Sequence, residues 1–187
     1  MAEQAEDPVA QGVTGAPRSG AITVDVRLCM TCRECEVACS LEHEDECNPE
    51  ISRVRVLFDD LVVGFPEIHI CEQCAEPACY EACVARNGES HALSLDPRTG
   101  ARYVEASKCR GCGACARACP LTARYPVLRF RQVGRKRVYF KCDLCKDSAI
   151  GPICVNVCPG GALTFVSAAE RQGETAAPVA VAPEKGE

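Results

Sequence analysis

The sequence predicts an α+β fold in which a duplicated module of short strands, hairpins and short helices surrounds groups bound to cysteine. Three observations lead to this prediction. The chain of 187 residues contains 17 cysteines, about 9%, far above the usual content of globular proteins. Leu, Ile, Val and Phe together make up 40 residues, about 21%, so apolar side chains alone build only a small core. Sixteen of the cysteines form four groups with related spacings, which indicates an internal repeat.

Disulfides or bound metal could supply the cohesion that the small core lacks. Metal is favoured, because the number of cysteines is odd and residues 1–20 contain no charged segment followed by an apolar one, as an export signal would. No apolar stretch approaches the roughly 18 residues of a membrane span. The formal net charge of −5 argues against a nucleic-acid-binding protein. We therefore expect a soluble, cytoplasmic protein without membrane insertion.

Composition also predicts the domain boundaries. Residues 1–20 and 167–187 are rich in Ala, Pro, Gly and Glu and have no apolar period, so we expect a disordered tail at each end. Residues 21–166 then form one domain that contains every cysteine.

Short strands are expected near both ends of this domain and after the first cysteine group. Ile22–Val26 and Leu163–Val166 are strand-like runs at its opposite ends, and their pairing would close the module. Val54–Phe58 alternates in polarity and precedes a turn at Asp59-Asp60. Each run is too short to be stable by itself.

Two hairpins are expected between the later groups. Residues 93–104 read as two strands joined by a turn that contains Pro and Gly. Residues 124–141 read as a hairpin that turns at Gly134-Arg135. This second segment carries seven basic residues and no acidic residue.

The four cysteine groups share one pattern. The x3 step between the third and fourth Cys suits one helical turn, which predicts short helices at Arg33–Leu41 and Gly113–Pro120. The groups read C-x2-C-x2-C-x3-C at residues 29–39, C-x2-C-x4-C-x3-C at residues 71–83, C-x2-C-x2-C-x3-C at residues 109–119 and C-x2-C-x8-C-x3-C at residues 142–158.

These spacings favour iron–sulfur clusters. A C-x2-C-x2-C loop can hold three corners of a 4Fe-4S cluster, and in the run C-x2-C-x2-C-x3-C-P the fourth Cys ligates the other cluster of a pair. Groups one and three match this spacing, and group three also has Pro120. Gly111 and Gly113 remove side chains where backbone N–H groups approach sulfur, whereas Thr31 replaces glycine in group one.

Zinc and disulfides are the alternatives. Structural zinc sites use two C-x2-C turns separated by a longer loop, and a third and fourth Cys at x2 and x3 would crowd a tetrahedral ion. Group four taken alone, with eight residues between Cys145 and Cys154, would look like a zinc site. Because group four occurs together with three groups of related spacing, iron–sulfur chemistry is favoured for it as well.

The order of the groups, with Lys141-Cys142-Asp143-Leu144-Cys145 opening the fourth, resembles the four-cluster ferredoxin-like electron-transfer subunits of molybdenum and tungsten oxidoreductases. Examples are the iron–sulfur subunits of dimethyl sulfoxide reductase and formate dehydrogenase and the carbon monoxide dehydrogenase-associated ferredoxin. The resemblance covers about Ile22–Val166. Within it, Leu28–His43 looks most like the small subunits of tungsten aldehyde oxidoreductase-type enzymes. The resemblance implies a bacterial-ferredoxin-like fold around four 4Fe-4S clusters.

The resemblance also implies which cysteines share a cluster, because this family pairs group one with group four and group two with group three. No catalytic residue and no cofactor ligand beyond these cysteines is expected, and Cys47 stands outside the groups. Carried over cysteine by cysteine, the ligands are Cys29, Cys32, Cys35 and Cys158 (set one); Cys39, Cys142, Cys145 and Cys154 (set two); Cys71, Cys74, Cys79 and Cys119 (set three); and Cys83, Cys109, Cys112 and Cys115 (set four).

The implied function is a relay of electrons between a catalytic subunit, of the molybdenum or tungsten aldehyde oxidoreductase type, and an external acceptor or donor such as a flavoprotein or ferredoxin. The chain would then be a non-catalytic member of a hetero-oligomer. Alternatively, the chain could be a ferredoxin-like partner of a carbon monoxide dehydrogenase, hydrogenase or formate dehydrogenase. A structural zinc scaffold is a remote alternative. Nothing in the sequence favours an enzyme, because it has no phosphate-binding loop, dinucleotide motif or Ser/His/Asp pattern.

Charged segments and histidines admit more than one interpretation. The basic segment 124–141 could bind nucleic acid, but we expect it to balance the negative charge of the clusters or to dock an acidic partner. Residues 42–50 carry five acidic side chains around Cys47, and we expect them to form a solvated loop in which this thiol has no role. The alternative is that Cys47 acts as a ligand or a redox group. As separate segments they suit different partners. The three histidines lack an i, i+4 partner and are expected at the surface, namely His43, His69 and His91.

Overall fold

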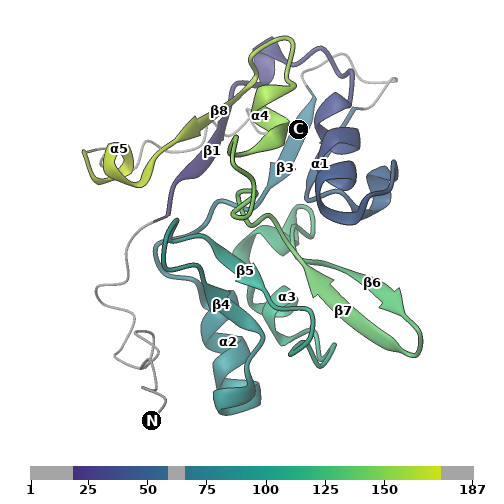
Figure 1. The fold of residues 1–187 in the computed structure, drawn as a ribbon, viewed down its shortest axis with the longest axis vertical. Helices are drawn as coiled ribbons and strands as arrows, with labels where there is room; N and C mark the ends of the chain where they lie inside the picture. Colours follow the sequence, from purple (N-terminus) through teal and green to yellow (C-terminus); the bar gives the residue numbers. More distant parts are fainter. Residues whose placement is uncertain (1–18, 59–65, 174–187) are drawn as a thin grey trace, which may run out of the picture.

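The computed structural model describes residues 19–58 and 66–173 of the chain. These residues form short helices and pairs of antiparallel strands, a mixed helix and strand architecture (Figure 1). The helices are α1 (Glu34–Glu44), α2 (Ala78–Asn87), α3 (Ala114–Ala118), α4 (Ile153–Asn156) and α5 (Ala168–Gly173), with 3-10 turns at Val26–Leu28, Pro49–Ile51, Gly88–Ser90 and Pro120–Ala123. The strands are β1 (Ala21–Val24), β2 (Val54–Leu57), β3 (Glu67–Ile70), β4 (Leu93–Leu95), β5 (Arg102–Val104), β6 (Arg129–Val133), β7 (Lys136–Phe140) and β8 (Leu163–Val166).

The strands of the described residues form four separate antiparallel pairs rather than one sheet. The first and last strands, β1 and β8, pair with Val24 opposite Leu163 and Ala21 opposite Val166. The predicted closure of the domain by its end strands is therefore confirmed. It brings the first cysteine group, which follows β1, beside the fourth group, which precedes β8.

The other three pairs lie between successive cysteine groups. Strand β2 pairs with β3, while the expected turn at Asp59-Asp60 lies outside the described residues. The predicted hairpin at residues 93–104 is present as β4 and β5. The carboxylate of Asp96 fixes its turn by accepting bonds from the N–H of Thr99 at 2.7 Å and its hydroxyl at 2.8 Å. Strands β6 and β7 form the second predicted hairpin, with Gly134 and Arg135 in the turn.

Two hydrophobic cores divide the described residues, and cysteines are part of both. Around the first, α1 packs against α4; around the second, α2 packs against α3 (Figure 1). Ile22, Val54 and Leu163 are among the apolar members of the first core. Leu93 and Leu128 belong to the second. Because each core has few large side chains, the cysteines and what they bind complete the interior.

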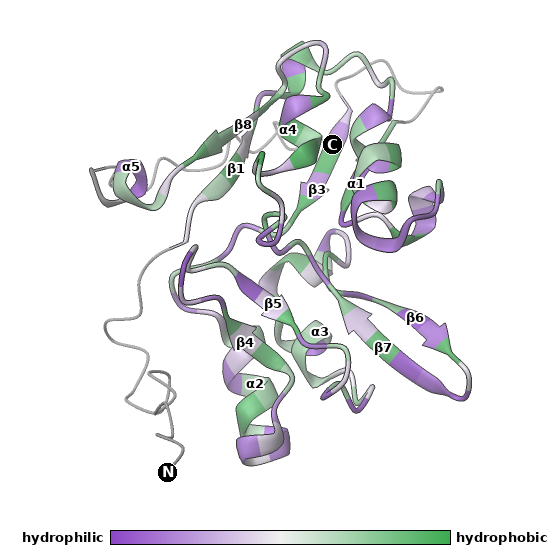
Figure 2. Cartoon of the chain, in the orientation of Figure 1, coloured by the Kyte–Doolittle hydropathy of each residue, from purple (hydrophilic) through white to green (hydrophobic). Residues whose placement is uncertain are grey.

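The hairpin of β6 and β7 extends away from both cores. Figure 2 shows that hydrophilic residues dominate β6 and much of β7. Phe140 and Val138 of β7 are buried, whereas Phe130 of β6 is 47% exposed. One face of the hairpin therefore packs on the domain while the other carries charge at the surface.

The domain extends slightly beyond its predicted limits on both sides. Ser19 is fully buried, and its carbonyl accepts a bond from Arg171 at 3.1 Å. Arg171 lies on α5, which begins in a segment expected to be a tail. Ser167 and Glu170 form a reciprocal capping box there, with the Ser167 N–H 2.7 Å from Glu170 Oε2, and this box stabilises the first turn. The rest of both expected tails, residues 1–18 and 174–187, lies outside the described residues.

No helix in the described part of the chain has the length and apolar character needed to span a bilayer. The longest, α1, has 11 residues, about half of what a span requires.

Candidate metal centres

The four C-x2-C turns share an uncommon backbone conformation. In each of them the residue directly before the second Cys has a positive φ, of 55° at Thr31, 51° at Gln73, 71° at Gly111 and 60° at Leu144. Side chains other than glycine adopt this region at a cost of about 1–2 kcal/mol, so three of the four turns hold a strained residue at the same place. Strain that recurs at one position of a repeat marks a site whose geometry is required.

Gly111 shows why one of these turns needs glycine. A Cβ atom at this position would lie 2.4 Å from the carbonyl oxygen of Arg137 on β7. The turn of group three therefore packs directly on the hairpin. The sequence-based argument, that glycine permits close backbone approach, is correct, and the backbone that approaches is that of β7.

The cysteines of set one line a single cavity at the start of α1. Val56 and Ile68 from β2 and β3, together with Ala162 and Leu163, form its apolar walls. Burial, with smaller contributions from Glu36 and the neighbouring thiolates, raises the pKa of Cys35 to about 12. The four thiols in this cavity come from both ends of the domain and are Cys29, Cys32, Cys35 and Cys158.

Set two and set three each line a cavity of their own. The cavity of set two lies between α1 and α4 and is walled by Val54, Ile70 and Leu144. The cavity of set three is walled by Val127 and Leu128, with Lys141 at its edge. Their thiols are Cys39, Cys142, Cys145 and Cys154 in the first, and Cys71, Cys74, Cys79 and Cys119 in the second.

The members of set four gather in the second core. Cys83 on α2, Cys115 on α3 and Cys109 in the loop before α3 are buried in one cluster. Burial and the thiolate of Cys83 raise the pKa of Cys115 to about 12. Cys112 lies on the same loop and is exposed. The structure thus places the four cysteines of sets one, two and three in one cavity each, and three of the four cysteines of set four in the second core.

The thiols also reveal which sets are neighbours. Burial and nearby thiolates raise the pKa of Cys154 in set two, and one of these thiolates is Cys35 of set one. Burial and the thiolates of Cys154 and Cys71 raise the pKa of Cys142. Cys71 belongs to set three, so set two lies between sets one and three.

Set four adjoins set three in the same way. The thiolate of Cys79, a member of set three, contributes to the raised pKa of Cys115 in set four. The two cores agree with these neighbours, because sets one and two contribute cysteines to the first core, set four contributes to the second, and set three contributes Cys71 to the first and Cys79 to the second. The sets therefore follow one another in the order one, two, three, four.

Hydrogen bonds to sulfur test whether these sites suit iron–sulfur clusters. The N–H of Arg53 donates to Cys39 Sγ at 3.2 Å, and the N–H of Tyr139 donates to Cys109 Sγ at 3.4 Å. The Nζ of Lys141, which is 3% exposed, lies 3.4 Å from Cys71 Sγ. Such donors stabilise thiolate ligands and tune a cluster. The 17 cysteines are free thiols in this structure. The four-thiol cavities and these donors fit iron–sulfur clusters.

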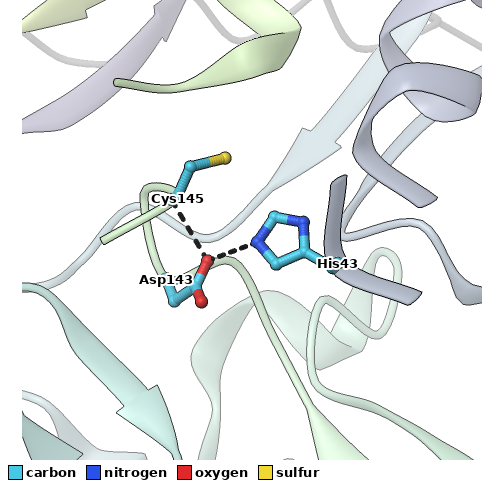
Figure 3. A group of neighbouring side chains, drawn as sticks. All are labelled: His43, Asp143 and Cys145. Atoms are coloured by element: carbon cyan, nitrogen blue, oxygen red, sulfur yellow. Dashed lines mark hydrogen bonds and ion pairs between the residues drawn. The ribbon is translucent and has the colours of Figure 1, made fainter. Parts of the chain in front are cut away.

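His43 is a functional candidate that sequence reasoning misplaced at the surface. Its side chain is 10% exposed and bridges α1 to the fourth cysteine group (Figure 3). Nε2 lies 2.8 Å from Oδ1 of Asp143, and Nδ1 lies 2.9 Å from the carbonyl oxygen of Cys39. Both partners are acceptors, so both ring nitrogens carry hydrogen. Burial lowers the pKa of His43, but its hydrogen bonds, the first of them with Asp143, outweigh burial and raise it to about 12.

The other two histidines are also less exposed than expected. His69 is 12% exposed and stacks on Tyr125. His91 is half-buried and lies edge-on to Tyr80. Their ring partners lie outside the i, i+4 spacing, because Tyr125 is 56 positions from His69 and Tyr80 is 11 positions from His91. Cys47 is exposed and lines none of the three cavities.

The acidic and basic segments lie against each other, which corrects the expectation that they are separate. Glu44 forms ion pairs with Arg131 of the basic hairpin and with Arg53, the latter at 3.1 Å. Arg129 donates to the carbonyl oxygen of Glu50 at 3.1 Å. Part of the basic segment therefore neutralises the acidic one inside the chain.

Comparison with known proteins agrees with these sites. The family described as "4Fe-4S dicluster domain" matches residues 63–168. A polyferredoxin-like subunit of an aliphatic sulfonate oxidoreductase from Pyrococcus furiosus is 43% identical over 131 residues, which are 70% of this chain and 66% of that subunit. The chain thus spans slightly less than two thirds of the Pyrococcus relative.

Two relatives from Escherichia coli extend the comparison. The electron transport protein HydN is 34% identical over 161 residues, which cover 78% of this chain and 86% of HydN. The formate dehydrogenase-O iron–sulfur subunit is 29% identical over 198 residues, which cover 88% of this chain and 62% of that subunit. With its thiol-lined sites and these relatives, the chain is an electron-transfer iron–sulfur protein and belongs to the 4Fe-4S dicluster domain family.

Proposed function

We propose that the domain holds four 4Fe-4S clusters, one at each of sets one to four, and relays electrons along them. Each bound cluster accepts and returns a single electron. The protein supplies the thiolates, the N–H donors and the apolar walls that exclude water from the inner sites. The observation that carries this proposal is the linear order of four four-thiol sites through the domain.

The fold is, in this proposal, a duplicated ferredoxin-like module. Two features repeat between its halves besides the C-x2-C turns. The fourth Cys of group one accepts an N–H from Arg53, the residue before β2. The fourth Cys of group two accepts an N–H at 3.4 Å from Ala92, the residue before β4. The same helix-to-strand connection thus serves the same purpose twice, as a duplication requires.

The working unit is proposed to be a hetero-oligomer with a catalytic oxidoreductase subunit, of the molybdenum or tungsten type. The relatives support a catalytic partner, since two of them are subunits of an aliphatic sulfonate oxidoreductase and of a formate dehydrogenase. A second redox protein, a flavoprotein or ferredoxin, would exchange electrons at the other end of the relay. The chain itself performs no substrate chemistry, because all sixteen grouped thiols are used as ligands, and it acts in the cytoplasm.

Metal analysis tests this proposal directly. Anaerobically purified protein should contain about sixteen iron and sixteen acid-labile sulfide per chain, since four clusters hold four of each. Stepwise reduction followed by electron paramagnetic resonance should show interacting 4Fe-4S signals. A content of about four zinc ions and no labile sulfide per chain would show that the protein is a structural zinc scaffold and not a relay. A content of about eight iron per chain would show that it holds two clusters and not four.

A further inference from the structure

Two of the sixteen grouped cysteines are exposed, and they lie at opposite ends of the order of sites. Cys32 belongs to set one and Cys112 to set four, while every cysteine of sets two and three is buried or half-buried. Electron transfer weakens steeply with distance, so a partner must approach one of the two outer sites. Each exposed cysteine thus marks the surface where such a partner can dock.

The surface around Cys112 is cationic. Arg110 is its neighbour in the loop and is exposed. Arg117 on α3 donates from Nη1 to the Cys112 carbonyl at 3.2 Å. Arg137 on β7 approaches the same loop, where its carbonyl oxygen leaves no room for a side chain at Gly111. Arg110, Arg117 and Arg137 thus belong to the loop, the helix and the strand that meet at the exposed Cys112.

No acidic residue balances this charge in the neighbouring sequence. From Ala106 to Cys142 the chain has ten basic residues and no acid. Arg131 and Arg129 are engaged by the acidic segment. In the described ranges 19–58 and 66–173, by contrast, none of the three arginines around Cys112 forms a salt bridge.

An exposed apolar residue lies at the edge of this surface. The guanidinium of Arg137 stacks over the ring of Phe130 at 4.9 Å from its centroid, and Phe130 is 47% exposed. Val133 on the same strand is 50% exposed. Aromatic residues and arginine are both enriched in protein interfaces.

The surface around Cys32 has a different character. Its exposed neighbours Leu28 and Met30 are apolar, 49% and 60% exposed. The nearby charges are paired within the chain, Arg33 with Glu36 at 2.8 Å and Arg27 with Asp25 at 2.7 Å. The two ends of the relay thus differ in charge, and only the Cys112 end attracts an anion.

We propose that the surface formed by Arg110, Arg117, Arg137 and Phe130 around Cys112 docks an acidic electron-carrier protein that exchanges electrons with the site of set four. This inference rests on the proposed relay and specifies which end serves a diffusing partner. Unpaired arginines raise the rate of encounter with an anionic protein. The compact patch beside a redox site favours such a carrier over nucleic acid, which would need a longer basic track to follow its phosphates.

The test uses the full-length holoprotein and a reduced acidic plant-type 2Fe-2S ferredoxin as the probe. Stopped-flow mixing measures the second-order rate constant of cluster reduction at about 50 mM and about 500 mM NaCl, which span strong and weak screening. The variant carries Arg110→Gln, Arg117→Gln and Arg137→Gln. The control carries Arg27→Gln, Arg86→Gln and Arg98→Gln, which change the net charge equally but lie outside the loop and hairpin.

The wild type should react about tenfold faster at low salt than at high salt. The variant should lose most of this difference, while the control keeps it. Equal rates and equal salt profiles for wild type and variant would overturn the docking proposal. It would also be overturned if the variant no longer bound a single-stranded DNA 20-mer but reacted with ferredoxin at the wild-type rate. Iron content and reduction by methyl viologen radical are measured on each sample. Failure of these two readouts in the wild type would instead overturn the relay itself.

Discussion

The ammonium group of Lys141 lies beside the thiol of Cys71, with Nζ 3.4 Å from Sγ, although the two residues are 70 positions apart. The same ammonium donates to the carbonyl oxygens of Arg102 and, at 2.8 Å, of Cys142. Lys141 thus holds a positive charge in the interior, between the cysteines of set two and those of set three. A buried cation at this place favours the more negative, reduced state of whatever these thiolates bind.

Replacing Lys141 by Met should therefore lower the reduction potential of the set-three cluster by on the order of 100 mV. Potentiometric titration followed by electron paramagnetic resonance measures the shift. Lys136→Met is the matched control, because Lys136 lies on the same strand and is exposed, and it should leave all potentials within error. A shift of similar size in both variants would show that the effect is not local to Cys71.

Replacing Gly111 by Ala should disturb the fourth site. Besides the strain of its positive φ, the new Cβ would press on the Arg137 carbonyl, so the loop must move away from β7. We expect lower iron content and a lower thermal midpoint. Gly134→Ala provides the control, since Gly134 has a φ of 60° but a Cβ added there would meet no heavy atom within 4 Å, and it should cost only about 1 kcal/mol. Equal effects would assign the requirement to φ alone.

Replacing Cys39 by Ser should damage the set-two site and spare the set-one site, because Cys39 lines the cavity of set two although it belongs to the first cysteine group. Electron paramagnetic resonance and iron analysis should show one altered cluster with the set-one signal retained. Cys47→Ser serves as the control for a thiol outside the groups. Selective loss of the set-one signal would contradict the exchange of fourth cysteines between groups.

Removing the iron should unfold the domain. The two cores contain few large apolar side chains and include the cysteines themselves, so the organic part of the interior offsets little of the chain's conformational entropy. Anaerobic chelation should abolish most of the far-ultraviolet circular dichroism signal. An apo-protein that still unfolds cooperatively near the holoprotein's midpoint would refute this account of its stability.

Spacing in the sequence predicted what depends on neighbours along the chain and on a repeat. The hairpin at residues 93–104 and the turn at Gly134-Arg135 follow from short-range patterns. The pairing of the end strands was inferred from two strand-like runs at opposite ends of the domain. The grouping of cysteines into sets required the family resemblance, because spacing alone does not say which group supplies the fourth Cys.

Long-range polar contacts were not predictable in this way. Net charge by segment could not show that Glu44 lies against Arg131, 87 residues away. The search for a histidine partner within one helix missed Asp143, which is 100 residues from His43. Lys141 was counted among the basic residues of the segment 124–141, but that count could not show that it is buried beside Cys71. Each of these contacts depends on the packing of segments whose approach only the fold determines.

The pairing of β1 with β8 gives the chain a nested order with a consequence for its biosynthesis. Along the sequence, sets three and four lie between the cysteines of the other two sets, because residues 71–119 contain all of their members. These two sites can therefore be complete soon after the middle of the chain leaves the ribosome. Sets one and two draw on residues up to Cys158, and β8 closes them last. Cys29, Cys32 and Cys35 therefore lack their fourth partner, Cys158, until more than 100 further residues have been translated. This interval is when a nascent chain is most open to oxidation or to capture of the wrong metal.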